Sequence, residues 1–242
     1  MKIGIIGFGR LGKLIAARLV QDANVLIYDI ENYQKEIEEI GAIASSIEEV
    51  AKCPIIIPFV PMSSFQDVLR EIAPLLEKDT LVIDVCSVKS EPVKWMKEIL
   101  PDSVSLLGTH PMFGPDSAKN TLYGAKIVLT PVRIKDEIFQ NISSYLSDHG
   151  LKVIHSTPEE HDKQIAHSLL LTHFLGRTLM DFGAESLEID TKGYRRLMKI
   201  LETVENDSWQ LFEDMNRYNP YAEETRKEFL ESLTRIHKKV SQ

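Results

Sequence analysis

The chain of 242 residues has 43% hydrophobic and 26% charged residues, as globular proteins commonly do. Its formal net charge of -8, without a block of like charges, argues against a nucleic-acid partner. No apolar run approaches the ~20 residues of a membrane span or forms a secretory signal, and two cysteines make no disulfide framework, so the cytoplasm is the expected location.

The N-terminal segment predicts a strand, a glycine turn and a helix. The apolar run KIGIIG is followed by GFGRLG and then by LIAARLV, which has helical spacing. Gly7, Gly9 and Gly12 fit the pattern G-x-G-x-x-G. In that pattern the first glycine permits the turn, the second lets the backbone approach a pyrophosphate, and the third lets the helix pack against the strand.

The helix that follows the turn points its first N–H groups toward the phosphates of a bound dinucleotide. Arg10 and Leu11 therefore join the three glycines as predicted cofactor-binding residues. The second strand, NVLIYD, ends at Asp29, seventeen residues after Gly12. A carboxylate there can accept hydrogen bonds from both ribose hydroxyls and would repel a 2′-phosphate, so NAD is the preferred cofactor and NADP a possible one. Alternatively, Asp29 caps a helix that begins near Glu31.

Strands and helices continue to alternate along the first half of the chain. The predicted strands cover residues 53–60, 80–85, 104–110 and 125–130, and the helices cover 63–76 and 135–150. Pro58 cannot donate a ladder hydrogen bond, so we expect the strand 53–60 to end there. The alternation predicts an α/β fold, a doubly wound and mostly parallel Rossmann-type sheet.

In such a sheet, ligands bind beyond the carboxyl ends of the strands. That edge would gather the glycine turn, DVCSVKS (84–90) and GTHPMFGP (108–115). Histidine changes its charge near neutral pH more readily than other side chains. His110 is either the polar residue of an ordinary turn or a base that a rigid loop aims at a substrate, and its place at this edge favours the base.

From Thr157 onward the pattern is helical, with predicted helices over 157–187, 192–218 and 220–239. We therefore predict two domains, a dinucleotide-binding domain over 1–153 and a smaller all-helical domain over 154–242. So small a helical unit should bury one apolar face against the sheet domain, a partner subunit or both, and we expect a homodimer through these helices.

Three histidines, His161, His167 and His173, recur at intervals of six residues in the first of these helices. On a regular helix each interval turns the side chain by about 120° relative to its neighbour, so no metal site is expected there. His173 and Arg177 do share a face, being four residues apart. His173 is either a core histidine bonded to a neighbouring helix or part of a functional site.

The motifs GFGRLG, DVCSVK and GTHPMFGP, in this order and followed by the helical segment SLLLTHFLGRTL, resemble the prephenate/arogenate dehydrogenases of tyrosine biosynthesis. The helical segment is more similar to the arogenate-type enzymes. The resemblance implies oxidative decarboxylation of arogenate or prephenate with hydride transfer to NAD(P)⁺, which gives tyrosine or 4-hydroxyphenylpyruvate.

The same resemblance implies roles for individual residues. His110 would be the catalytic residue, Ser87 its partner, and His173 a residue of the substrate pocket. The two substrate carboxylates call for cationic partners. The candidates are Lys89, Arg177, Arg195, Arg196 and Arg217, of which Lys89, Arg177 and Arg217 are assigned to substrate binding.

Other classes stay open at this point. The first histidine of an S-H-L-P-H helix motif, which the common bacterial prephenate enzymes carry, is absent, so the substrate side chain is undecided. A β-hydroxyacid dehydrogenase or an imine reductase would share the two-domain plan without needing His110. A non-catalytic dinucleotide-sensing protein would keep the glycines and Asp29 without using His110 and Ser87.

Overall fold

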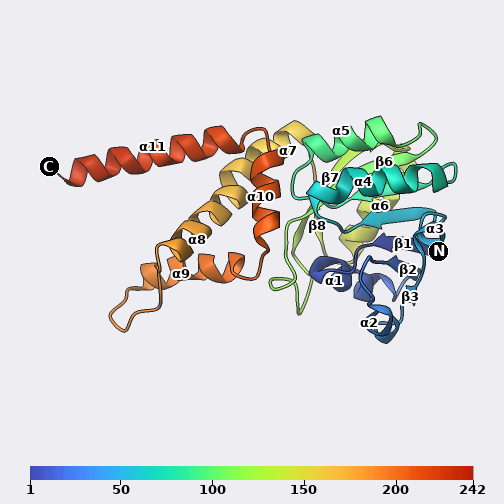
Figure 1. The fold of residues 1–242 in the computed structure, drawn as a ribbon, viewed down its shortest axis with the longest axis horizontal. Helices are drawn as coiled ribbons and strands as arrows, with labels where there is room; N and C mark the ends of the chain where they lie inside the picture. Colours follow the sequence, from blue (N-terminus) through green and yellow to red (C-terminus); the bar gives the residue numbers. More distant parts are fainter. Residues whose placement is uncertain (242) are drawn as a thin grey trace. The chain divides into compact units, whose positions relative to one another are not determined.

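The computed structural model describes residues 1–241, apart from the side chain of residue 203. It divides into two compact units, Met1–Pro158 and Glu159–Gln242. The first unit contains a sheet with helices, and the second is helical (Figure 1). The division after Pro158 lies five residues beyond the predicted boundary at residue 153.

A single sheet of eight strands organises the first unit, in the order β3-β2-β1-β4-β5-β6-β7-β8. All neighbouring strands are parallel except β6 and β7. The prediction of a mostly parallel Rossmann-type sheet is therefore confirmed. The strands are β1 (Lys2–Ile6), β2 (Asn24–Tyr28), β3 (Ile43–Ala44), β4 (Ile55–Pro58), β5 (Leu81–Asp84), β6 (Ser105–Pro111), β7 (Lys126–Arg133) and β8 (Lys152–His155).

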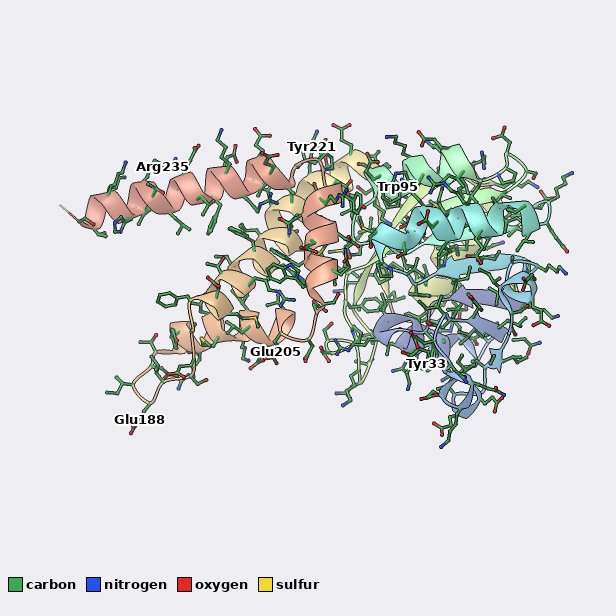
Figure 2. All side chains as sticks on the ribbon, viewed as in Figure 1. Tyr33, Trp95, Glu188, Glu205, Tyr221 and Arg235 are labelled. Carbon is green, nitrogen blue, oxygen red and sulfur yellow. The ribbon has the colours of Figure 1, made fainter. Side chains whose placement is uncertain are left out.

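Helices cover both faces of this sheet. They are α1 (Arg10–Leu19), α2 (Gln34–Glu39), α3 (Ile47–Val50), α4 (Met62–Ile72), α5 (Ser90–Ile99) and α6 (Asp136–Asp148). Right-handed crossovers in this strand order place α1 and α6 on one face and α4 and α5 on the other. The Tyr145 hydroxyl of α6 donates to Asp22, just after α1, at 2.7 Å. On the other face, the ring centroids of Phe65 in α4 and Trp95 in α5 lie 6.4 Å apart. Trp95 is labelled in Figure 2.

Several boundaries differ from the sequence-based prediction. The fourth strand ends at Pro58 as expected, because proline has no N–H to continue the ladder. The strand predicted to end at residue 110 continues to Pro111, because β6 pairs with the antiparallel β7 beyond the end of β5. Helix α2 begins at Gln34 with Tyr33 as its N-cap, so the interpretation of Asp29 as a helix cap is wrong.

The second unit is entirely helical, as predicted. Its elements are α7 (Pro158–Ile165), a π-helical segment (Ala166–Leu170), α8 (Leu171–Asp181), α9 (Lys192–Val204), α10 (Trp209–Tyr218) and α11 (Ala222–Val240). Gly176 lets α8 pack tightly on α9, since an added Cβ would lie 2.5 Å from Cγ2 of Val204.

Two local features of this unit depart from the predicted pattern. The helix predicted over 192–218 is two helices, because the Ser208 hydroxyl accepts the Leu211 N–H at 3.1 Å and caps a new helix, α10. The π-helical segment interrupts the regular rotation between α7 and α8. The angular argument about His161, His167 and His173 therefore does not apply, since it assumed one uninterrupted helix.

Candidate active site

The glycine turn has the geometry that a dinucleotide-binding site needs. Gly7 has a φ of +99°, which side chains with a Cβ rarely adopt, and an added Cβ would clash with the Phe59 carbonyl. A Cβ on Gly12 would clash with the Gly7 carbonyl, so this glycine permits α1 to pack against the turn. A Cβ on Gly9 would meet nothing within 4 Å. Gly9 therefore leaves open space beside the N-terminus of α1, where a pyrophosphate can approach.

Helix α1 begins directly at this open space. Gly9 is its N-cap residue and offers no side chain to the first N–H groups. Those groups have no acceptor within the helix, and Leu11 and Gly12 supply two of them. Together with the positive end of the helix dipole, they form an anion-binding position.

The Asp29 carboxylate lies at the end of β2 and bonds to both neighbouring loops. Its Oδ2 accepts the Phe8 N–H at 2.5 Å, and its Oδ1 accepts the Glu31 N–H at 2.9 Å. A carboxylate has about four acceptor positions, so these two bonds leave capacity for ribose hydroxyls. Asp29 thus fixes the glycine turn and can also take part in binding the cofactor.

Arg10 lies beside the same space, on the first turn of α1. Its Nη2 lies 2.6 Å from Oδ1 of Asp116, in the segment between β6 and β7. Both side chains are about half exposed. The ion pair links the glycine turn to the segment that follows His110.

His110 lies inside β6 and is only 4% exposed. Its backbone pairs with Val128 of the antiparallel β7. On the other side of β6, Gly108 pairs with Asp84, the last residue of β5. Pro111 has no N–H to donate. It is tolerated in β6 because the pairing of β6 with β5 ends at Gly108, so β5 accepts no hydrogen bond from position 111. The strand itself, rather than a turn, therefore fixes the backbone of His110.

Ser87 lies in the segment between β5 and α5 and is half-buried. Because β5 and β6 are adjacent and parallel, this segment and His110 lie at the same edge of the sheet. The glycine turn follows β1, which runs parallel to them in the same sheet. The predicted gathering of the glycine turn, DVCSVKS and GTHPMFGP at one edge agrees with this topology.

Lys89 makes a different set of contacts from those of a surface lysine. Its side chain is completely buried, and its Nζ lies 2.5 Å and 2.6 Å from the two carboxylate oxygens of Asp84. It also donates to the carbonyl oxygen of Thr109 at 2.5 Å. This geometry favours a role in holding β5 against β6 over the substrate contact that the sequence suggested.

In the helical unit, the side chains of His173 and Arg177 gather around the segment that precedes α10. His173 is 3% exposed, and its Nε2 lies 3.6 Å from Oδ2 of Asp207. Arg177 donates through Nη2 to the Asp207 carbonyl, and its guanidinium carbon lies 5.6 Å from the Trp209 ring centroid. Within the described residues, His173 Nδ1 and Arg177 Nε are buried without a hydrogen-bond partner.

The environment of His173 favours its neutral form. Burial lowers the pKa of this imidazole below its usual value, and nearby Arg177 lowers it further, whereas Asp207 raises it. The burial effect is the largest of the three. A negatively charged group placed beside Nδ1 would favour protonation of His173.

The other predicted cations of this unit lie elsewhere. Arg217 stacks its guanidinium carbon 5.6 Å from the Tyr218 ring and lines a groove with Phe174 and Arg226. Arg195 is paired with Asp190 at 3.2 Å, and Arg196 is exposed.

Asp84 and Asp207 are the residues that sequence reasoning missed. Asp84 could have been found, because a carboxylate inside the apolar run TLVIDV needs a buried partner. Asp207 has no comparable signal, since NDSW resembles an ordinary polar connection. Among residues 1–241, no group of three histidine, cysteine or acidic side chains could hold a metal ion. In the same range, no helix has the length and apolarity to cross a membrane.

A glycine turn of this geometry, an acidic residue at the end of β2 and the doubly wound sheet define a nucleotide-binding protein of the Rossmann class. Comparison with known proteins narrows this class. The family described as "Prephenate dehydrogenase, nucleotide-binding domain" matches residues 16–155, and that described as "TYRAAT1-like, C-terminal domain" matches residues 178–242.

Curated relatives match along almost the whole chain. Arogenate dehydrogenase 1 and arogenate dehydrogenase 2 of Arabidopsis thaliana, both chloroplastic, are 34% and 33% identical to it over 98% of its length. The chain spans 38% of the first relative and 67% of the second. It therefore belongs to the prephenate dehydrogenase family.

A solved structure shows the same fold over the whole chain. The prephenate dehydrogenase of A. aeolicus, in complex with hydroxyphenyl propionate and NAD⁺, superposes with a TM-score of 0.80 at 21% identity. The comparison covers 100% of this chain and 91% of that one. It confirms the predicted combination of a Rossmann-type sheet with a helical C-terminal part.

Proposed function

We propose that this protein catalyses the NAD(P)-dependent oxidative decarboxylation of arogenate, prephenate or both. The observation that carries the proposal is the placement of His110 at the carboxyl edge of a sheet whose first turn has dinucleotide-binding geometry. The names of the two plant relatives support arogenate as a substrate, and that of the A. aeolicus enzyme supports prephenate. The products would be tyrosine from arogenate and 4-hydroxyphenylpyruvate from prephenate.

The residues of the first unit fit a nicotinamide dinucleotide. The open space at Gly9 and the first N–H groups of α1 would hold the pyrophosphate, and Asp29 would bind the ribose hydroxyls. When bound, the oxidised nicotinamide supplies the hydride acceptor. We propose NAD⁺ as the preferred form, because the Asp29 carboxylate would repel a 2′-phosphate, and the NAD⁺ complex of the A. aeolicus enzyme is consistent with this choice.

His110 would act as the general base. The substrate carries a hydroxyl and a hydrogen on one ring carbon and a carboxylate on the opposite carbon. As the hydride leaves the first carbon, the His110 imidazole accepts the hydroxyl proton, and Ser87 orients the imidazole or the hydroxyl. Loss of the opposite carboxylate as CO₂ makes the ring aromatic, so the reaction runs in one direction. General-base assistance of this kind is worth about 10²–10⁴-fold.

The helical unit would supply the partners for the substrate carboxylates. Arg177 is a permanent cation, and His173 Nδ1 is buried with no hydrogen-bond partner among the described residues. A carboxylate that bonds to either nitrogen atom, His173 Nδ1 or Arg177 Nε, would supply the acceptor that the atom lacks. We assign His173 and Arg177 to substrate binding on this ground and keep Arg217 as a further candidate.

The decisive experiment measures NADH and NADPH formation by the purified protein. Arogenate and prephenate are compared side by side with NAD⁺ and NADP⁺. Turnover of at least one substrate is the expected result, with NAD⁺ used more efficiently. Binding of NAD⁺ without turnover of either substrate would contradict the proposal and favour a dinucleotide-sensing protein.

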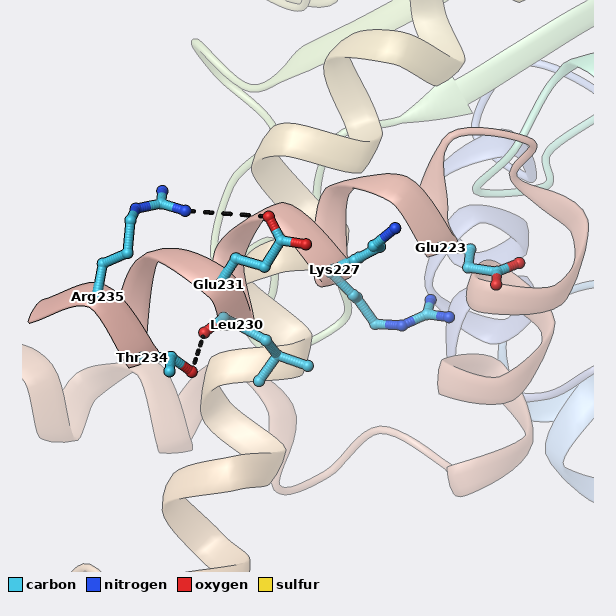
Figure 3. Close-up of a pocket in the computed structure, with 7 residues that line it drawn as sticks. Glu223, Lys227, Leu230, Glu231, Thr234 and Arg235 are labelled. Atoms are coloured by element: carbon cyan, nitrogen blue, oxygen red, sulfur yellow. Dashed lines mark hydrogen bonds and ion pairs between the residues drawn. The ribbon is translucent and has the colours of Figure 1, made fainter. Parts of the chain in front are cut away.

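We also propose a homodimer formed through the helical unit. Leu230, Leu233, Ile236 and Val240 form one stripe along α11, and each is at least half exposed. The outer half of α11, near Arg235, stands clear of the other helices of its unit (Figure 2). Leu230 also lines a groove that carries side chains of both charge signs, where Glu231 pairs with Arg235 at 3.9 Å (Figure 3). Such a face suits a second copy of the same helix.

Sedimentation analysis tests the dimer. Leu233→Glu should convert it to a monomer, because the new charge would have to be buried in the interface. Lys238→Glu, on the same helix and outside the apolar stripe, is the control. A monomeric wild-type protein would refute the dimer. The cytoplasm stays the predicted location, to be tested by cell fractionation, and the two plant relatives are chloroplastic.

A further inference from the structure

The ion pair between Lys89 and Asp84 lies directly behind the proposed base. Both side chains are completely buried. A buried ion pair is weak evidence for stability, because desolvating two charges costs about as much as their attraction returns. A gain in stability therefore does not explain why this pair lies next to the strand that carries His110.

The contacts of the pair converge on the residue before His110. Lys89 donates to the Thr109 carbonyl at 2.5 Å, and the Thr109 hydroxyl donates to the Asp84 carbonyl at 2.7 Å. Thr109 is thus held at its carbonyl and at its side chain. Because its carbonyl belongs to the peptide bond that precedes His110, Lys89 limits the rotation of that peptide plane.

The same carboxylate holds the segment that carries Ser87. Oδ1 of Asp84 accepts the Cys86 N–H at 2.8 Å. Room for this carboxylate comes from Gly108, where an added Cβ would lie 3.2 Å from Asp84 Oδ2. A single buried pair therefore connects the backbone next to Ser87 with the backbone next to His110.

From these contacts we infer that Lys89 and Asp84 are positioning residues for the catalytic step, and that they fix the His110 and Ser87 segments relative to each other. This inference rests on the proposed role of His110. Neither residue needs to touch the substrate. Loss of the pair should therefore lower kcat and leave KM unchanged, since a displacement of about 1 Å at a reacting group can cost about 10²-fold in rate.

The test uses the double variant Asp84→Asn/Lys89→Met. Removing both charges together avoids leaving one buried charge without its partner, which would unfold the chain. The introduced asparagine keeps an oxygen for the Cys86 N–H, whereas the introduced methionine cannot donate to Thr109. The kcat is expressed per NAD⁺-binding site, as titrated by fluorescence, so that unfolded molecules do not count.

The expected result is a fall in kcat per site of about 10²-fold, with KM for the substrate and affinity for NAD⁺ unchanged. A merely structural pair would lower the melting temperature and leave kcat per site as in the wild type. That second outcome would overturn the inference.

The matched control is an ion pair at the N-terminal end of β6. Arg133 pairs with Asp102 at 2.7 Å and donates to the Val104 carbonyl at 2.9 Å, just before the strand begins. Asp102→Asn/Arg133→Met should lower the melting temperature without changing kcat per site. An equal loss of kcat in this control would show that any loosening of β6 has the same effect, and it would overturn the special role of Lys89 and Asp84.

A second measurement does not depend on turnover. Hydrogen–deuterium exchange of the peptide covering residues 105–111 should be faster in the Asp84→Asn/Lys89→Met variant than in the wild type, with β1 unchanged. If the wild-type protein oxidises neither substrate, the proposed function fails, and this exchange still decides whether the pair holds the segment. Unchanged exchange would refute the connection itself.

Discussion

The two units hold their buried histidines by different means. His110 and His173 are equally buried, at 4% and 3% exposed. The sheet holds His110 through its backbone, with β7 on one side and the Lys89–Asp84 pair behind it. The helical unit holds His173 among side chains and a connecting segment, and leaves its Nδ1 without a partner among the described residues.

This is the difference expected between a prearranged reacting group and a binding group that a ligand completes. A general base gains most from a fixed position, which paired strands provide. A binding residue gains from an unsatisfied polar atom, because a ligand that bonds to it removes the cost of burying that atom alone. The comparison therefore predicts a kcat effect for His110 and a KM effect for His173.

The largest effect is expected at His110. His110→Ala should lower kcat by about 10²–10⁴-fold, because the proton acceptor is lost while the glycine turn is untouched. Affinity for NAD⁺, measured by calorimetry, should stay as in the wild type. Loss of NAD⁺ binding would instead make His110 a structural residue and erase its contrast with His173.

The next effect concerns the cofactor. Asp29→Ser should reduce the preference for NAD⁺ over NADP⁺ by at least about tenfold, since the charged acceptor for ribose is lost together with the repulsion of a 2′-phosphate. The ratio of kcat/KM for the two cofactors measures it. Glu31→Gln, two residues away and exposed, is the control. An unchanged ratio would contradict the assignment of Asp29 to the ribose.

His173→Ala should raise the substrate KM by about tenfold, the loss of one charge-assisted hydrogen bond, with a smaller change in kcat. His167→Ala is the matched control, because His167 is exposed on the π-helical segment. Steady-state kinetics with both substrates separates the two constants. A kcat loss as large as that of His110→Ala would erase the proposed difference between the units.

The smallest effect is on stability as a function of pH. The folded pKa of His173 lies below its unfolded value of about 6.5, because burial disfavours the charged form. Below that pH the unfolded chain binds a proton that the folded chain does not. The free energy of unfolding therefore decreases as the pH falls from about 6.5 toward the folded pKa, and above 6.5 His173 has no such effect.

Denaturant unfolding of the wild type and of His173→Gln at neutral and mildly acidic pH measures this dependence. The variant should lose less stability on acidification than the wild type does. Equal losses would show that His173 is not buried in its neutral form. Asp207 and Arg177 are the charged groups that face the imidazole.

The sequence predicts the first unit in more detail than the second because its signals are local. Gly7, Gly9 and Gly12 each meet a steric condition set within one strand, turn and helix, and Pro58 ends its strand by lacking a donor. The extension of β6 from His110 to Pro111 could not be predicted, because it depends on pairing with Ile127 of β7, sixteen residues away. The direction in which the Lys89 side chain points depends in the same way on a distant residue, because its Nζ donates to the carbonyl of Thr109, twenty residues along the chain.

The helical unit has fewer local signals. The residues on both sides of Ser208 have helical spacing, and the break there depends on the Ser208 hydroxyl, which accepts a backbone N–H and caps a new helix. The π-helical segment leaves the apolar pattern almost unaltered. The contact between Asp207 and His173 joins two different helices through a connecting segment, and no spacing in the sequence indicates it.

The buried pair of Asp84 and Lys89 also restricts how this family can diverge. A chain that exchanges one of the two passes through an intermediate with an isolated charge in its interior, and most such intermediates would be lost by selection. We therefore expect the two positions to change together or not at all. Gly108 should be kept with them, because it leaves room for the Asp84 carboxylate. Descendants can then alter the residues that face the substrate while the frame behind the base stays the same.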